Sequence, residues 1–72
     1  MSEEIELEKS YSAKQSAAKL RRLADALDSE QTFNIQIDGK KVKVPSSATV
    51  AIEYEAADGE EELEFEIKWK SE

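Results

Sequence analysis

Carboxylates are the most numerous side chains in this sequence that could take part in catalysis or in binding. Of the 72 residues, 17 are Asp or Glu and 10 are Lys or Arg, while His and Cys are absent. Without His the chain lacks the usual general base near neutral pH, and without Cys it lacks thiolate nucleophiles and disulfides. This composition excludes tetrahedral zinc sites and Ser-His-Asp hydrolysis. Two kinds of chemistry are still open to the carboxylates: acid–base catalysis by a pair of them, and the binding of cations or basic partners.

Catalysis by a carboxylate pair needs one buried acid with a raised pKa. Every acidic residue here lies at a position that we predict to face solvent or to belong to a loop. Ser46 and Ser47 have no base nearby in the sequence, and no Gly-rich loop is present to cradle a phosphate. We therefore predict that the protein is not an enzyme, with no catalytic residues, no metal ligands and no cofactor.

The elements that must position these charges begin with a helix. Ser12 and Gln15 form the Ser-x-x-Gln pattern of a capping box, which predicts a helix from Ala13 to about Asp28. Its apolar residues recur at steps of three and four, which gives the helix one face for the core. The residues of that stripe are Ala13, Ala17, Leu20, Leu23, Ala24 and Leu27.

Two hairpins are predicted after the helix, each centred on an Asp-Gly dipeptide that favours a tight turn with positive φ. The turn at Asp38-Gly39 sets Ile35 opposite Val42 and Phe33 opposite Val44. The turn at Asp58-Gly59 does the same for a second row of apolar pairs. Those pairs are Tyr54 with Leu63, Ile52 with Phe65, Val50 with Ile67, and Ala48 with Trp69.

The predicted fold is a single small α+β domain over residues 1–72. We expect a short N-terminal strand at residues 4–9, one amphipathic helix, and a four-stranded antiparallel meander with the helix packed on one face. The N-terminal strand would cover a sheet edge, either within one chain or exchanged between two copies. Trp69 is expected to anchor the core beside Ala48.

The end of the chain carries the most distinctive pattern, Glu62-Leu63-Glu64-Phe65-Glu66-Ile67-Lys68-Trp69-Lys70. Together with the helical segment Lys19-Leu20-Arg21-Arg22-Leu23-Ala24-Asp25-Ala26-Leu27, it resembles the small amphi-Trp domain family of archaea and bacteria, from about residue 11 to residue 70. The resemblance implies a stand-alone domain of uncharacterised role and favours an archaeal source. It implies no catalytic or ligand residues.

The outer face of the second hairpin is the first candidate site. Its predicted register sets Glu53 opposite Glu64 and Glu55 opposite Glu62, with Glu66 next along the strand. Opposed like charges destabilise a sheet. Three interpretations are open: a solvated face that serves solubility, a docking face for a basic protein partner, and a weak divalent-cation site.

A basic face is the second candidate site. Lys14, Lys19, Arg21 and Arg22 lie on the helix, and Lys40, Lys41 and Lys43 lie around the first hairpin. Such a group can contact the phosphates of nucleic acid. A net charge of −7 and the lack of interleaved aromatic residues argue against that interpretation.

The preferred function is therefore a small protein-interaction module, acting by self-association as a homodimer or by binding a charged protein partner. The alternatives are a nucleic-acid-associated accessory protein that uses the basic face, and a stand-alone salt-adapted structural domain with no ligand. No apolar run is long enough for a transmembrane helix and the N-terminus lacks a secretion signal, so we expect a cytoplasmic protein without membrane contact. No small-molecule substrate is identified.

Overall fold

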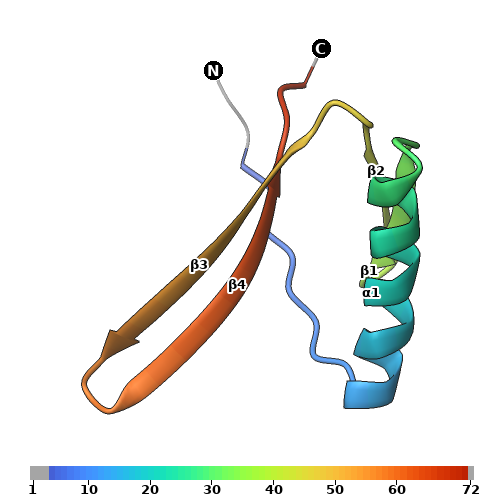
Figure 1. The fold of residues 1–72 in the computed structure, drawn as a ribbon. Coiled ribbons are helices and arrows are strands. Elements are labelled where there is room, and N and C mark those ends of the chain that lie inside the picture. The colour runs from blue at the N-terminus through green and yellow to red at the C-terminus, as the bar shows by residue number, and fades with distance from the viewer. Residues whose placement is uncertain (1–3, 72) are drawn as a thin grey trace.

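A helix and two hairpins make up the structure, a computed structural model that describes residues 4–71. Helix α1 spans Ala13–Asp28, and the strands are β1 (Phe33–Ile37), β2 (Lys40–Val44), β3 (Thr49–Ala57) and β4 (Glu60–Lys68). The strands pair antiparallel as two separate two-stranded sheets, β1–β2 and β3–β4. In Figure 1, α1 lies beside the first hairpin, whereas β3–β4 is an arm that extends away from both. The α+β class and the antiparallel pairing are as predicted.

Helix α1 begins where its capping residues predict. Ser12 accepts a hydrogen bond from the amide of Gln15 at 3.1 Å, and the Gln15 side chain accepts one from the amide of Ser12, also at 3.1 Å. These bonds satisfy amides that have no partner inside the helix. Ser29 ends the helix, and Glu30 follows with a φ of 54°. The predicted helix boundaries are therefore confirmed.

Both Asp-Gly turns form as predicted. Asp38 and Gly39 have φ values of 48° and 85°, and Asp58 and Gly59 have values of 54° and 81°. Positive φ at both central residues matches the right-handed twist of the flanking strands. The resulting registers, including Phe33 opposite Val44 and Ile52 opposite Phe65, confirm the predicted pairings within the strands, while the predicted pair of Ala48 and Trp69 lies beyond the ends of β3 and β4.

The predicted four-stranded meander is wrong, because β2 and β3 do not pair. Pro45 follows β2 directly and has no amide hydrogen to donate to a continuing ladder. The amide of Ala48 donates to the carbonyl of Pro45 at 3.1 Å, and this turn redirects the chain before β3 begins. No Cα atom of β3 or β4 lies within 8 Å of one in α1, β1 or β2. The helix contacts β1 and covers no part of the second hairpin.

The core is smaller than predicted. Phe33 and Val44, opposite each other on the first hairpin, are each 7% exposed and are the buried apolar side chains of residues 4–71. The row on β4 that was expected to lie on this core is exposed at Leu63, Phe65 and Trp69 and partly covered at Ile67, so the predicted anchoring role of Trp69 is wrong.

The predicted N-terminal strand does not form either. Residues 4–12 have no regular secondary structure, and Ile5 and Leu7 are exposed. Alternation of two apolar residues does not stabilise a strand that has no partner for its backbone hydrogen bonds.

Candidate interaction surface

The β3–β4 hairpin presents one apolar face. Because side chains alternate across a strand, the register that pairs Ile52 with Phe65 collects the large apolar residues on the same side. Ile52 is 63% exposed, Leu63 is 62% exposed and Phe65 is 55% exposed. This surface, here called the apolar face, consists of Val50, Ile52, Tyr54, Leu63, Phe65 and Ile67, and Trp69 follows at its base.

A polar pair lies on the apolar face towards its tip. The Tyr54 hydroxyl donates a hydrogen bond of 2.8 Å to the Glu61 carboxylate. This bond, with a small contribution from desolvation, raises the pKa of Tyr54 above its ordinary value of 10.0. The pair places a polar rim at one end of an aromatic and aliphatic surface.

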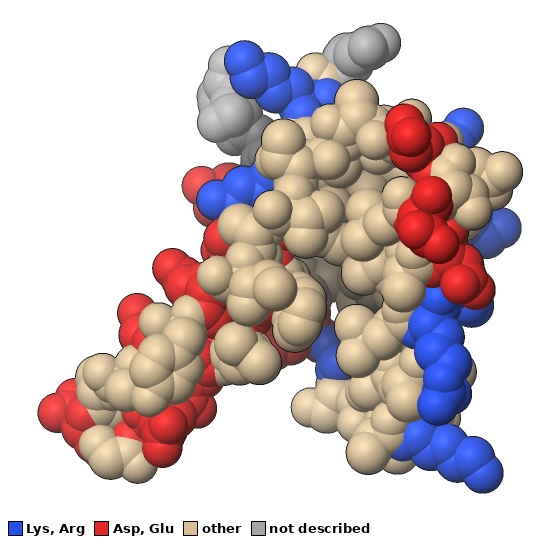
Figure 2. Space-filling model, viewed as in Figure 1, with Lys and Arg blue, Asp and Glu red and all other residues tan. Residues whose placement is uncertain are grey.

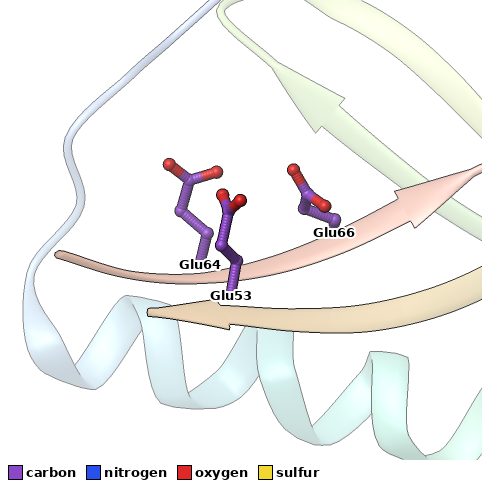
Figure 3. A group of neighbouring side chains, drawn as sticks. All are labelled: Glu53, Glu64 and Glu66. Carbon is purple, nitrogen blue, oxygen red and sulfur yellow. The ribbon is translucent and has the colours of Figure 1, made fainter. Parts of the chain in front are cut away.

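The opposite side of the hairpin, here called the acidic face, gathers all five predicted acidic residues. Glu53 lies opposite Glu64 and Glu55 lies opposite Glu62, as predicted. Glu53, Glu64 and Glu66 point to the same side of the hairpin, and each offers a carboxylate oxygen within 4.8 Å of the others (Figure 3). Lys68 is the nearby cation, with its Nζ 3.8 Å from Glu66.

Crowding of the carboxylates changes their proton affinity. A hydrogen bond with Glu62 raises the pKa of Glu64 above its ordinary value of 4.5, and the negative charges of Glu62, Glu53 and Glu66 raise it further. The ionised form is disfavoured because the neighbouring charges repel it. Such a face can attract a basic side chain or a hard cation, each of which would relieve the repulsion.

Some of the predicted basic residues contact other parts of the chain, and others are exposed to solvent. Arg22 donates a hydrogen bond of 2.6 Å to the carbonyl of Asn34, and its guanidinium lies 5.3 Å from the centre of the Phe33 ring. Lys19 lies 4.6 Å from the centre of the Tyr11 ring. Both side chains therefore help attach the helix to the rest of the chain. Lys14 and Arg21 are exposed.

A basic pocket lies between α1 and the first hairpin. It has a volume of about 570 Å³, and the structure brings Lys19 and Arg22 together there with two lysines of β2. Lys14, Arg21 and Lys40 do not line it. Its lining residues are Lys19, Arg22, Asn34, Ile35, Gln36, Lys41, Val42 and Lys43.

Comparison with known proteins agrees with the pattern of the last strand. The family model described as Amphi-Trp domain matches residues 1–72, the whole chain. The chain belongs to the Amphi-Trp domain family. Neither the curated proteins nor the solved structures gave a match to it.

The position of the tryptophan suits the family name. In this Amphi-Trp domain, Trp69 follows β4 directly, beyond the pair formed by Thr49 and Lys68. It lines a surface pocket of about 550 Å³ at the base of the arm with Ser47, Thr49, Lys68 and Lys70. Within residues 4–71, no helix has the length and apolar character needed to cross a membrane.

The apolar face is the part of the surface that sequence reasoning missed, because its residues were assigned to the core. Two signals in the sequence bear on it. Pro45 interrupts the chain between the hairpins, and the sequence pattern predicts one amphipathic helix for two hairpins. The Amphi-Trp domain thus presents its longest hairpin with an apolar side and an acidic side both facing solvent.

Proposed function

We propose that this Amphi-Trp domain is a protein-interaction module that binds through its β3–β4 hairpin. The observation that carries the proposal is the exposure of the apolar face, on which Ile52, Leu63 and Phe65 are each more than half exposed. Monomeric soluble proteins rarely leave a large contiguous apolar patch in water. Aromatic residues surrounded by polar groups are also the usual composition of protein interfaces.

Two classes of partner suit this hairpin. A second copy of the chain would cover the apolar face, and a basic protein would find complementary charge on the acidic face. The proposal takes the protein to be cytoplasmic and to act by binding and not by catalysis, as the composition without His and Cys favours. Charge on the acidic face would then increase the rate of encounter, while burial of the apolar face would supply affinity.

Site-specific photocross-linking in cells of the source organism tests the proposal. A photoreactive benzoylphenylalanine replaces Phe65 on the apolar face, and as a control replaces Lys40, which is exposed on the first hairpin and lies outside the basic pocket. We expect a covalent adduct of defined mass from position 65 and none from position 40. Absence of an adduct at position 65, with the protein folded and expressed, overturns the proposal. The mass and peptide content of the adduct distinguish a second copy from another protein.

A nucleic-acid-associated accessory role is the second candidate, and the basic pocket is the observation that favours it. Lys19, Arg22, Lys41 and Lys43 concentrate positive charge in a chain whose net charge is −7. The pocket lining includes no aromatic side chain for base stacking. Binding would therefore be weak, insensitive to sequence and dependent on salt.

Gel shifts at low ionic strength with mixed DNA and RNA test this role. If it is correct, tens of micromolar protein shift the probe, and K41E/K43E removes the shift while K14E, whose lysine lies outside the pocket, retains it. A wild-type protein that gives no shift excludes the role. If cross-linking and gel shifts both fail, the remaining interpretation is a salt-adapted structural domain with no ligand.

A further inference from the structure

Within residues 4–71, two apolar surfaces on the helix and strands are left exposed. One is the apolar face of the β3–β4 arm, and the other lies on α1, where Leu20 is 51% exposed and Leu27 is 44% exposed. Seven residues make nearly two turns of a helix, so Ala13, Leu20 and Leu27 form one row along α1. Leu20 and Leu27 stay exposed although α1 contacts β1, so this row, here called the leucine row, is not covered by the first hairpin.

The surface area of the chain indicates how much of it a partner would cover. The structure exposes 6742 Å². A compact monomer of 8.1 kDa is expected to expose about 4,500 Å², so the excess is about 2,200 Å² per chain. The radius of gyration is 13.9 Å, against about 11 Å for a compact chain of this length. The excess area of two chains taken together falls within the roughly 2,000–5,000 Å² of surface that obligate homodimers bury.

We propose that two copies form a two-fold symmetric dimer in which the apolar face of each lies across the leucine row of the other. This inference rests on the proposed function and names its partner as a second copy. Each copy then supplies one hairpin and receives one, which is the self-complementary contact that two-fold symmetry requires. Both uncovered apolar surfaces are buried by the same contact.

The distribution of charge favours this reciprocal contact over one between the two hairpins. Lys14 and Arg21 are seven residues apart and exposed, and they lie on the side of α1 next to the leucine row. A partner hairpin lying there brings Glu61, on its apolar face, towards these cations. Hairpin stacked on hairpin would instead gather the carboxylates of two copies, would leave the basic residues unpaired, and would leave the leucine row in water.

The shape of the chain leaves space for the hairpin of a second copy. Figure 2 shows an open hollow between the arm and the helix, with acidic residues along the arm, basic residues along the lower outer side of the helix and acidic ones above them, and mostly uncharged residues facing the hollow. The connector at residues 45–48 is short and holds the turn between Pro45 and Ala48, which carries the arm away from its own helix. Short connectors of this kind favour exchange of an element between copies.

Mass measurement by sedimentation equilibrium over a concentration series tests the dimer. We expect the wild-type chain at tens of micromolar to have twice the monomer mass of 8.1 kDa. F65S and L20S alter the two sides of one contact, and each should weaken the dimer by about tenfold or more in Kd, as central apolar interface residues do. The matched control is E64S, which changes the neighbouring residue on the opposite side of the same strand and should leave the dimer intact.

A mixing experiment distinguishes the reciprocal contact from every other arrangement. Each F65S homodimer has two damaged hairpins, and each L20S homodimer has two damaged helices. A heterodimer of the two variants has two different contacts. In one, the F65S hairpin lies on the L20S helix, so both sides are damaged. In the other, the hairpin of the L20S chain lies on the helix of the F65S chain, and both sides are wild type. We expect an equimolar mixture to associate more tightly than either variant alone. Far-UV circular dichroism establishes that Phe65 and Leu20, both exposed, are changed without loss of the fold.

Three outcomes would overturn the inference. They are a wild-type monomer at these concentrations, an L20S dimer as tight as wild type, and a mixture no tighter than its components. A monomer with an apolar face protected from hydrogen exchange would instead show that the arm folds onto its own helix. If the chain is monomeric while position 65 still cross-links to another protein, the dimer fails and the proposed function stands.

Discussion

The two hairpins of this chain follow the same local rules and have opposite surroundings. Each has an Asp-Gly turn with positive φ and apolar residues that meet across the strands. In β1–β2 the apolar pair of Phe33 and Val44, at the end of the ladder away from the turn, is buried, because α1 lies beside it and Arg22 covers the Phe33 ring. In β3–β4 the apolar pair of Ile52 and Phe65 is exposed.

This difference shows that turn chemistry and alternation determine a hairpin and its register but not what covers it. An isolated two-stranded hairpin is marginally stable in water, and packing against a helix or further strands is what stabilises it. The first hairpin obtains that packing within the chain. The longer second hairpin obtains it, by our proposal, from a partner.

The largest effect should come from removing the aromatic ring of the first hairpin. F33A deletes one of the two buried apolar side chains, and we expect a loss of about 3–5 kcal/mol in the free energy of unfolding, which would unfold most of so small a domain. I52A, on the exposed pair, should cost far less in a dilute monomeric sample. Chemical denaturation followed by circular dichroism compares them. Equal losses would mean that the two hairpins are buried alike.

Arg22 links α1 to the first hairpin and should come second. R22A removes the hydrogen bond to the Asn34 carbonyl and the contact with the Phe33 ring, and we expect a cost of about 1–2 kcal/mol in unfolding free energy. R22K keeps the charge but loses the planar group, so its cost should lie between wild type and R22A. Urea denaturation of wild type, R22K and R22A measures the unfolding free energy of each and so gives their order of stability. An R22A protein as stable as wild type would show that the first hairpin does not depend on this contact.

Much of the local structure could be predicted from the sequence, because it depends on neighbouring residues. The capping box at Ser12 and Gln15, the helix bounds and both hairpin registers all follow from short-range spacing. The five residues of the acidic face were likewise placed together by register alone.

The assembly of these elements could not be predicted in the same way. Alternation assigns Phe65 and Trp69 to one side of a strand, but it does not say whether another surface lies there. Pro45 in the sequence indicates where a ladder ends, but it does not indicate that the two hairpins then form separate sheets. The burial of any apolar row depends on contacts between distant elements, and it is at this level that the predicted core and the predicted N-terminal strand were wrong.

The capping box offers a third test, which concerns α1 alone. S12A removes the side-chain oxygen that accepts the Gln15 amide, and we expect a loss of about 1 kcal/mol in unfolding free energy. S10A, two residues earlier and outside the helix, should change stability by less than about 0.5 kcal/mol. Hydrogen exchange then shows which amides lose protection. In a dilute monomer they should be those of α1 and β1–β2, and an equal loss in β3–β4 would contradict the separation of the hairpins.

The smallest effect should come from the acidic face, and it should depend on pH in the direction opposite to ordinary acid denaturation. The folded-state pKa of Glu64 is raised by Glu62 and by the charges of Glu53 and Glu66, so the folded hairpin binds this proton more tightly than the unfolded chain does. Its ionisation therefore costs stability as the pH rises through that raised value, and lowering the pH towards 4.5 restores it.

E64Q should remove this dependence. At pH 7 the variant should melt slightly higher than wild type, and the two melting temperatures should converge as the pH falls below the raised pKa of Glu64. The gain is small because the side chain is partly exposed and salt screens its neighbours, so it should shrink further as NaCl is added. E60Q is the matched control, since Glu60 lies opposite Ala57 and not opposite a carboxylate. Thermal melts at pH 7 and at mildly acidic pH measure both variants. If E64Q and E60Q behave alike, repulsion between opposed carboxylates on the acidic face does not determine the stability of the second hairpin. The exposed apolar face is then the main feature in which the second hairpin differs from the first.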